Sequence, residues 1–288
     1  MVTPPVVLTV AGTDSGGGAG IAADLATFAA LGVHGTCVVA AVTAQDTTAV
    51  HAVHAVPFDV VAAQLDAVIA DLPPVVVKTG MLATADVARL VARWCAGSPS
   101  RQLVVDPVLR ATTGAALADD DLVRAYAAVL LPVATVVTPN AAEARALLAL
   151  AADDPTPSRE LAGLLAAQLA GPAVVLTGGP LGAPAASSST CIDWLTRPGD
   201  EPVAIEHPAV ATPNDHGTGC THASALAAFL AHGHDVATAA ARAAAYVSGQ
   251  LVASRGWQLG SGRGPIAHTT DPNTILPRTT IPSTEETA

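Results

Sequence analysis

Short apolar runs typical of β-strands alternate with helical stretches along most of the chain, and this alternation constrains the fold more than any other feature. The expected strands are Val6–Val10, Gly35–Thr43, Val75–Val77, Leu103–Val105, Thr135–Val137 and Val174–Thr177. The expected helices are Ile21–Leu31, Asp59–Leu72, Thr84–Trp94, Asp119–Leu131, Ala141–Leu150 and Arg159–Ala170. Such alternation predicts an α/β fold, with a central, mostly parallel β-sheet flanked by helices on both faces.

The remaining segments complete one domain. Val50–Val56 is expected to protrude as a strand, and Cys191–Leu195 and Val203–Glu206 are expected to be edge strands. Two further helices are expected at Thr221–Ala231 and Val236–Ser254. Beyond about Pro265 the composition is rich in Pro, Thr, Asp, Asn and Glu. We therefore expect one domain over residues 1–265 and an irregular C-terminal tail over residues 266–288.

Composition limits the classes of function. Hydrophobic residues make up 51% of the 288 residues and charged residues 13%, so the chain has the apolar content for a large core. The net charge of −11 argues against a nucleic-acid groove or a patch for acidic membranes, and Gly and Pro interrupt the long charge-free runs. Four cysteines without C-x-x-C pairing, and no basic leader, are typical of reduced thiols in a cytoplasmic protein.

Polar residues and glycines gather immediately after the expected strands. They are Gly12, Gln45, Lys78 to Gly80, Asp106, Asn140 and Gly178 to Gly179. In an open α/β sheet, ligands bind at the carboxyl ends of the strands. The pattern recurs at six strands, and it predicts an enzyme-like site at that edge.

The segment Asn214–Thr221 contains two glycines and runs into an Ala-rich helical stretch. Unpaired amides of Gly217, Thr218 and Gly219, together with the helix dipole, predict a phosphate site. Cys220 follows them, where the same field is expected to lower the pKa of its thiol. An anion site beside an activated base suits phosphoryl transfer to a hydroxyl. The alternatives are a plain turn with a helix cap and a small buried cysteine.

A glycine-rich loop follows the first strand, from Gly12 to Gly20. It lacks the lysine of a phosphate-binding P-loop, and Ile21 stands where the dinucleotide fingerprint needs its last glycine. The remaining interpretation is a loop kept small so that a ligand lies against its backbone. Asp24 on the next helix is a candidate site residue, or else an exposed acid favoured by the helix dipole.

Three oxygen-bearing side chains are candidates for holding Mg²⁺. Asn140 and Glu143 lie three residues apart at a helix start, and Asp106 follows its own strand. The alternatives are a helix capping box for Asn140 with Glu143 and a capped turn for Asp106. Lys78 is the only lysine of the chain. Phosphate charge must therefore be met by backbone amides, Mg²⁺ or an arginine.

Taken in order, these motifs resemble the hydroxymethylpyrimidine/phosphomethylpyrimidine kinases of thiamine biosynthesis, which belong to the ribokinase-like superfamily. The resemblance runs from about Val6 to about Pro265. Its motifs are Ala11–Ile21 with Ala23–Leu25, Lys78–Leu82, Asp106–Val108, Thr138–Asn140 with Glu143, and Asn214–Thr221. It implies a ribokinase-like sheet and MgATP-dependent phosphorylation of 4-amino-5-hydroxymethyl-2-methylpyrimidine, and then of its monophosphate.

The resemblance also implies roles for individual residues. The implied anion hole is Gly217, Thr218 and Gly219, with Cys220 as the base. The implied pyrimidine contacts are Gly12, Asp24, Gln45 and Met81. The implied nucleotide and phosphate contacts are Asn140, Thr177, Gly179, Gly217 and Gly219, and the implied metal residues are Asp106 and Glu143. Family members are commonly homodimers, so a homodimer is expected.

Three segments depart from the family pattern. Thr177–Pro180 replaces a Lys-Gly-Gly-His sequence near the nucleotide, Gln45–Ala49 differs at the start of the lid, and Ala183–Thr190 is expected to be a loop. Two other functions stay open. One is a pyridoxine or pyridoxal kinase of the same superfamily, and the other is a ligand-binding regulator without catalysis. Gln45 and Met81 favour the aminopyrimidine kinase, and the retained catalytic motifs argue against the regulator.

Overall fold

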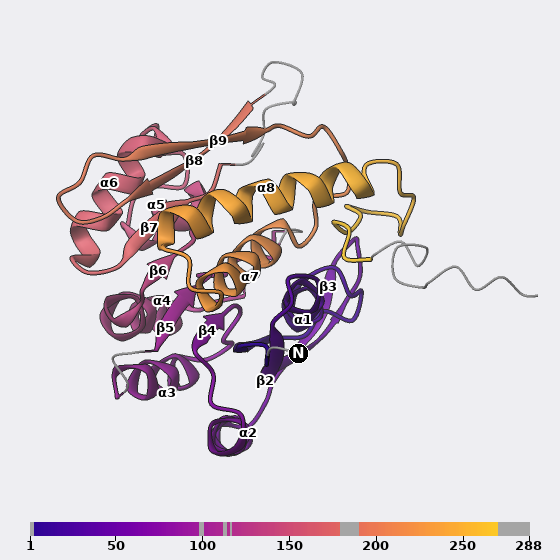
Figure 1. Ribbon diagram of the computed structural model, residues 1–288, viewed down its shortest axis with the longest axis vertical. Coiled ribbons are helices and arrows are strands. Elements are labelled where there is room, and N and C mark those ends of the chain that lie inside the picture. Colours follow the sequence, from indigo (N-terminus) through magenta and orange to yellow (C-terminus); the bar gives the residue numbers. More distant parts are fainter. Residues whose placement is uncertain (1–2, 98–100, 112–113, 116, 179–189, 270–288) are drawn as a thin grey trace, which may run out of the picture.

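A computed structural model describes residues 3–97, 101–111, 114–115, 117–178 and 190–269 of the chain. Its centre is a nine-stranded sheet with the order β3-β2-β1-β4-β5-β6-β7-β8-β9. Helices cover both faces of the sheet (Figure 1). The sequence prediction of an α/β fold with a mostly parallel sheet is therefore confirmed.

Six neighbouring strands run parallel and form the middle of the sheet. They are β1 (Val6–Gly12), β2 (His34–Gln45), β4 (Val76–Thr79), β5 (Gln102–Val105), β6 (Val136–Val137) and β7 (Ala173–Leu176). Most of their residues are buried, because helices cover both sides of a parallel sheet. The parallel arrangement brings their carboxyl ends to one edge.

Antiparallel strands close the sheet at both sides. They are β3 (Val50–Ala55) beside β2, and β8 (Thr190–Thr196) with β9 (Val203–Pro208) beyond β7. The prediction of an edge strand at Val203–Glu206 is confirmed, and the expected strand at Val50–Val56 is confirmed as a strand, which lies at the other edge. The prediction that Cys191–Leu195 lies at an edge is wrong, because β9 pairs with the outer side of β8.

Three helices cover one face of the sheet: α1 (Gly20–Ala30), α7 (Thr218–Ala231) and α8 (Val236–Ser254). Helix α7 lies between the sheet and α8 (Figure 1), and nine of its residues are buried. Its alanines and leucines are distributed around the whole helix, as expected for a helix with neighbours on both sides. The structure begins α7 at Thr218 and not at Thr221, so Gly219 and Cys220 belong to its first turn.

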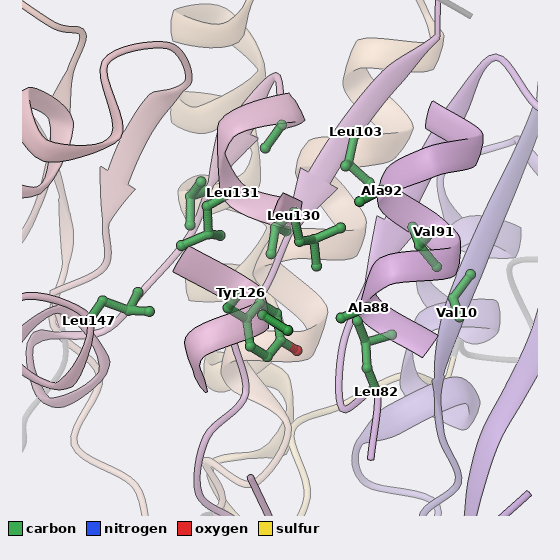
Figure 2. Close-up of a cluster of buried hydrophobic side chains, with 14 of the residues drawn as sticks. Val10, Leu82, Ala88, Val91, Ala92, Leu103, Tyr126, Leu130, Leu131 and Leu147 are labelled. Carbon is green, nitrogen blue, oxygen red and sulfur yellow. The ribbon is translucent and has the colours of Figure 1, made fainter. Parts of the chain in front are cut away.

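The other face is covered by five helices: α2 (Phe58–Asp71), α3 (Ala85–Ala96), α4 (Asp120–Ala125), α5 (Ala141–Leu147) and α6 (Ser158–Leu169). Figure 2 shows the core beneath this layer, which includes Val10 and Leu103 of the sheet together with Ala88 of α3 and Tyr126. Tyr126 is fully buried, and its hydroxyl donates a hydrogen bond to the carbonyl of Gly80 at 3.1 Å. This bond ties the core to the loop after β4.

The prediction of one helix over Asp119–Leu131 is wrong. Helix α4 ends at Ala125, a π-helical turn covers Tyr126–Leu130, and a 3₁₀ turn covers Leu131–Val133. Pro132 supplies no backbone N–H, so the helical hydrogen bond at this position is lost. The wider turn still places Tyr126, Leu130 and Leu131 in the core.

Packing continues beyond the predicted domain boundary at residue 265. Ile266 and Ala267 are each 1% exposed, and the amide of Ile266 donates a hydrogen bond to the carbonyl of His216. Most of the predicted tail, residues 270–288, lies outside the described residues. Over the described part of the chain, no helix combines the length and apolar character that a membrane crossing requires.

Candidate active site

A cavity of about 840 Å³ lies at the carboxyl ends of the parallel strands and is bordered by the start of α7. Its walls include residues that the sequence placed directly after the strands: Gly12, Gln45, Gly80, Asp106, Asn140 and Gly178. They also include Gly217, Thr218, Gly219 and Cys220. The predicted meeting of these segments at one edge of the sheet is therefore confirmed.

Gly217 makes the tight turn that begins α7. Its φ angle is +87°, and no side chain caps the helix. A Cβ atom on Gly217 would lie 1.8 Å from the carbonyl oxygen of Gly18, so the helix start and the glycine-rich loop touch through backbone alone. Amides at such a helix start, next to a cavity, suit an anion. Gly219 is different, since a Cβ there would meet nothing within 4 Å.

Cys220 lines the cavity, but its thiol is not activated in the way the sequence suggested. Burial raises its pKa to about 12; the Lys78 ammonium opposes this rise, and the carboxylates of Asp106 and Asp24 add to it. The prediction that the helix field lowers this pKa is therefore wrong for the protein without ligands. The reason is that removing the thiolate from water costs more than the nearby positive charges return.

Lys78 is the positive charge nearest to this thiol and is fully buried. Its Nζ donates to Oδ1 of Asp24 at 2.8 Å and lies 3.9 Å from Oδ2 of Asp106. Burial alone would lower the pKa of Lys78, but the charge of Asp24 raises it above the ordinary value. The ammonium therefore stays charged beneath the cavity.

Asp24, an expected contact of the pyrimidine, is held by protein groups. It is fully buried on α1 and is not among the residues that line the cavity. Its carboxylate accepts hydrogen bonds from Thr9 at 2.6 Å, from Lys78 and from Ser224 at 2.7 Å. The alternative of an exposed acid is therefore wrong, whereas a contact of Asp24 with the pyrimidine stays a prediction.

Asp106 and Glu143 form a pair of buried carboxyl groups at the cavity. Burial raises the pKa of Asp106 to about 6, although the Lys78 ammonium opposes this rise. Burial, together with the charge of Asp106, raises the pKa of Glu143 to about 8. Asn140 and Glu143 also form the capping box of α5, which was the alternative interpretation of this motif. Oδ2 of Asp106 has no hydrogen-bond partner among the described residues. Two carboxylates that lack enough positive partners suit a divalent cation.

The far side of the cavity holds the residues expected to contact a pyrimidine. Gly12, Gln45 and Met81 all line it. A Cβ on Gly12 would lie 2.3 Å from Cε of Met81, so glycine at this position gives the methionine room.

Thr177, an expected nucleotide contact, also lines the cavity, and its amide donates to the carbonyl of Pro139. Gly179, the other expected nucleotide contact, lies outside the described residues.

Sequence analysis did not single out Asp14 and His216. Both are 6% exposed, and Nε2 of His216 lies 2.9 Å from Oδ2 of Asp14 and 3.3 Å from Nε2 of Gln45. Burial tends to raise the pKa of Asp14, but hydrogen bonds from His216 and from the amides of Gly16 and Ala19 lower it on balance. The sequence contained one indication of their role, because Asp14 lies within the glycine-rich motif Ala11–Ile21 and His216 within the motif Asn214–Thr221.

Comparisons with known proteins show the family of this chain. The family model described as phosphomethylpyrimidine kinase matches residues 14–267. The chain belongs to the phosphomethylpyrimidine kinase family. It is 42% identical over 264 residues to a hydroxymethylpyrimidine/phosphomethylpyrimidine kinase of Synechococcus elongatus, covering 92% of this chain and 97% of that protein.

Two further proteins extend the comparison. A thiamine biosynthesis bifunctional protein of Geobacter sulfurreducens is 43% identical over 262 residues, which are 91% of this chain and 52% of that protein. A pyridoxal kinase of Staphylococcus aureus, solved with AMP-PCP and pyridoxal, superimposes with a TM-score of 0.80 at 30% identity, covering 93% of this chain and 94% of that one. This chain therefore shares its fold with a pyridoxal kinase.

The turn at Gly217 yields a test with a matched control. Gly217→Ala should lower the free energy of unfolding by about 1–3 kcal/mol. The new Cβ would clash with the carbonyl oxygen of Gly18, and residue 217 has a positive φ angle that strains alanine. Gly219→Ala should change it by less than about 0.5 kcal/mol, since its site is open. Urea unfolding followed by circular dichroism measures both. Equal stability of the two variants would contradict the packing described at this helix start.

Proposed function

We propose that this kinase transfers the γ-phosphoryl group of ATP to 4-amino-5-hydroxymethyl-2-methylpyrimidine and then to its monophosphate, for thiamine diphosphate synthesis. The observation that carries the proposal is one cavity, in a member of this family, that joins an uncapped helix start to two buried carboxyl groups and a thiol. Each feature answers one need of phosphoryl transfer: anion binding, cation binding and proton removal.

The chain's own groups supply most of the electrostatic stabilisation. Amides at Gly217–Cys220 face the charge that grows on the transferring group, and they are fixed before the reaction begins. Asn140, Thr177 and Gly179 are proposed to contact the nucleotide. Gly12, Gln45 and Met81 are proposed to hold the pyrimidine on the opposite side of the cavity. The substrate hydroxymethyl group then lies between the nucleotide phosphates and Cys220.

The cavity fits a magnesium ion. Asp106 and Glu143 offer oxygen ligands, and Oδ2 of Asp106, which lies 3.9 Å from the Lys78 ammonium, accepts no hydrogen bond among the described residues and keeps its lone pairs for a cation. Mg²⁺ takes few protein ligands and keeps several waters, so two carboxylates are enough. The bound ion would neutralise phosphate charge on ATP. We propose Asp106 and Glu143 as the residues that hold it.

Cys220 is proposed to accept the proton of the attacking hydroxyl. Because the pKa of its thiol is raised, little thiolate exists at neutral pH, and the fraction increases as the pH rises. Lys78 is the fixed positive charge that lowers the cost of this thiolate. In a loose transition state the hydroxyl loses its proton late, so even a small thiolate fraction supports turnover.

Two further expectations accompany this function. A homodimer is proposed, as the resemblance to the family implies. Four free cysteines support a reducing compartment such as the cytoplasm. The pyridoxal-bound structure of similar fold supports phosphorylation of a vitamin B6 alcohol as the second candidate function.

The first test offers hydroxymethylpyrimidine, its monophosphate and pyridoxal in parallel, with MgATP, and measures ADP release. Turnover on both pyrimidines is expected if the substrate hydroxyl lies, as proposed, between the anion site and the Cys220 thiol. Turnover on pyridoxal alone would overturn the substrate and keep the reaction. If pyrimidine binds by calorimetry while none of the three substrates releases ADP, the protein is a ligand-binding regulator.

The second test concerns the base. Cys220→Ala should lower kcat by about 10²–10⁴ and change the KM for pyrimidine little, the usual loss when a general base is removed. In the parent enzyme kcat should keep rising above about pH 8, beyond the pKa values of Asp106 and Glu143, because the thiolate fraction still grows there, and the variant should lose this rise. Near-normal turnover of Cys220→Ala, or an unchanged pH profile, would exclude Cys220 as the base.

A further inference from the structure

We infer that His222 is a cationic contact of the nucleotide phosphates, and that its ring takes up a proton from solvent when the nucleotide binds, with Asp193 holding the imidazolium. The inference deepens the proposed function and rests on its nucleotide site. It assigns His222 as a binding residue and Asp193 as the residue that positions its ring.

The cavity offers little uncommitted positive charge to a polyphosphate. Lys78, the only lysine of the chain, donates to the buried carboxylate of Asp24. Among the described residues, the arginines that line the cavity all donate hydrogen bonds to protein oxygens; they are Arg110, Arg145 and Arg263. A phosphate group would compete with these oxygens for the guanidinium donors. A further cation in the wall would therefore favour nucleotide binding.

His222 lies in the wall of the cavity, about one turn after the start of α7. It stands four positions after Thr218, another residue of the wall, so the two side chains lie on the same face of the helix. His222 is 4% exposed, and neither of its ring nitrogens has a hydrogen-bond partner in the part of the chain that the structure describes. Such a buried ring is unfavourable unless a ligand supplies the missing partners.

Asp193 of β8 faces this ring. Its Oδ1 accepts from the amide of Gly178 at 2.6 Å, and its Oδ2 lies 3.6 Å from Nε2 of His222. Its ionic partners within the described ranges are two histidines, His207 and His222. A carboxylate that is 2% exposed is stabilised when a cation lies beside it. A separation of 3.6 Å is too long for a good hydrogen bond, but an imidazolium at this distance is attracted to the carboxylate.

His207 of β9 is the other histidine at this carboxylate, and both of its ring nitrogens have neighbours. Nδ1 lies 3.1 Å from Oγ of Ser248, and Nε2 lies 3.3 Å from Oδ1 of Asp193. A proton that accompanies the nucleotide is therefore better placed on His222. The protonated ring has two N–H donors, one for Asp193 and one for a phosphate oxygen, whereas the neutral ring has only one.

The charges around His222 explain why its proton depends on the nucleotide. Burial lowers the pKa of His222; the carboxylate of Asp193 opposes this effect, and His207 adds to it. Helix α8 adds Ala244 and Val247 to the cavity, and neither carries a charge. Phosphate charge raises the pKa of the ring, so binding is strongest at low pH. The affinity falls as the pH rises through the pKa of the nucleotide-bound ring.

Calorimetric titration with MgADP tests the inference, because heats measured in buffers of different ionisation enthalpy give the number of protons taken up. Glutamine at position 222 keeps a polar side chain that does not titrate. At about pH 7 the parent should take up about 0.5–1 proton more per MgADP than His222→Gln. Phosphate, Asp106 and Glu143 also exchange protons on binding, and the difference between the two proteins removes their contribution. Equal uptake by both proteins would overturn the inference.

His207→Gln is the matched control, since it removes the other histidine beside the same carboxylate. It should keep the parental proton uptake. Loss of the uptake in His207→Gln and not in His222→Gln would place the proton on His207 and overturn the inference. If His222→Gln does not fold, His222→Phe replaces it, because phenylalanine is similar in size, suits a buried position and does not titrate.

The pH dependence of affinity separates a charged contact from a structural role. His222→Gln should raise the Kd for MgADP by about 10-fold at about pH 6.5 and by less than about 2-fold at about pH 9, where the parental ring is neutral even with nucleotide bound. A ratio of the two Kd values that stays constant over this range would show a merely structural role and contradict the inference.

A spectroscopic readout needs neither turnover nor pyrimidine. Long-range ¹H–¹⁵N spectra report the protonation of histidine rings, and His222→Gln or His222→Phe identifies the signal among nine histidines. The ring should be neutral in the free protein and protonated at both nitrogens with MgADP, and a ring that stays neutral would overturn the inference. If the ring is protonated with MgADP but no pyrimidine is phosphorylated, the proposed function fails and the inference stands.

Discussion

The buried ion pair between Lys78 and Asp24 is the interaction on which the site depends. Both side chains are fully buried, and a charge in such a place is tolerated only when it is paired and hydrogen-bonded. Thr9 and Ser224 complete the carboxylate's bonds, so the cluster joins β1, α1, β4 and α7. These contacts fix α1 and α7 against the sheet. Apolar packing alone would define the positions of the two helices less precisely.

Both of these helices begin at the cavity, and this is why the pair matters for function. Helix α1 follows the glycine-rich loop and α7 follows the turn at Gly217, and the two segments touch where Gly217 approaches Gly18. The same ammonium also faces Asp106 and lowers the pKa of the Cys220 thiol against the effect of burial. Lys78, the only lysine in the chain, therefore both supplies the positive charge beside Cys220 and helps to fix α1 against the sheet.

Sequence patterns predicted the sheet, most element positions and the edge that carries the site, because apolar periodicity and turn residues are local properties. They failed where a distant group decides the outcome. The π-helical turn at Tyr126 depends on core packing and Pro132, and the thiol pKa depends on how deeply Cys220 is enclosed. Asp24 and Lys78 stand 54 positions apart, so nothing local in their motifs indicates that they pair. The same holds for Asp14 and His216.

A double-mutant cycle on Lys78 and Asp24 tests the central claim most directly, with urea unfolding as the readout. Lys78→Met and Asp24→Asn should each cost about 3–5 kcal/mol, because each leaves a charge buried without its partner. The double variant should cost less than the sum of the two, by about 1–3 kcal/mol. Arg89→Met, which breaks a partly exposed pair with Asp86, should change stability little. Additive losses, or a Lys78→Met protein as stable as its parent, would contradict the account.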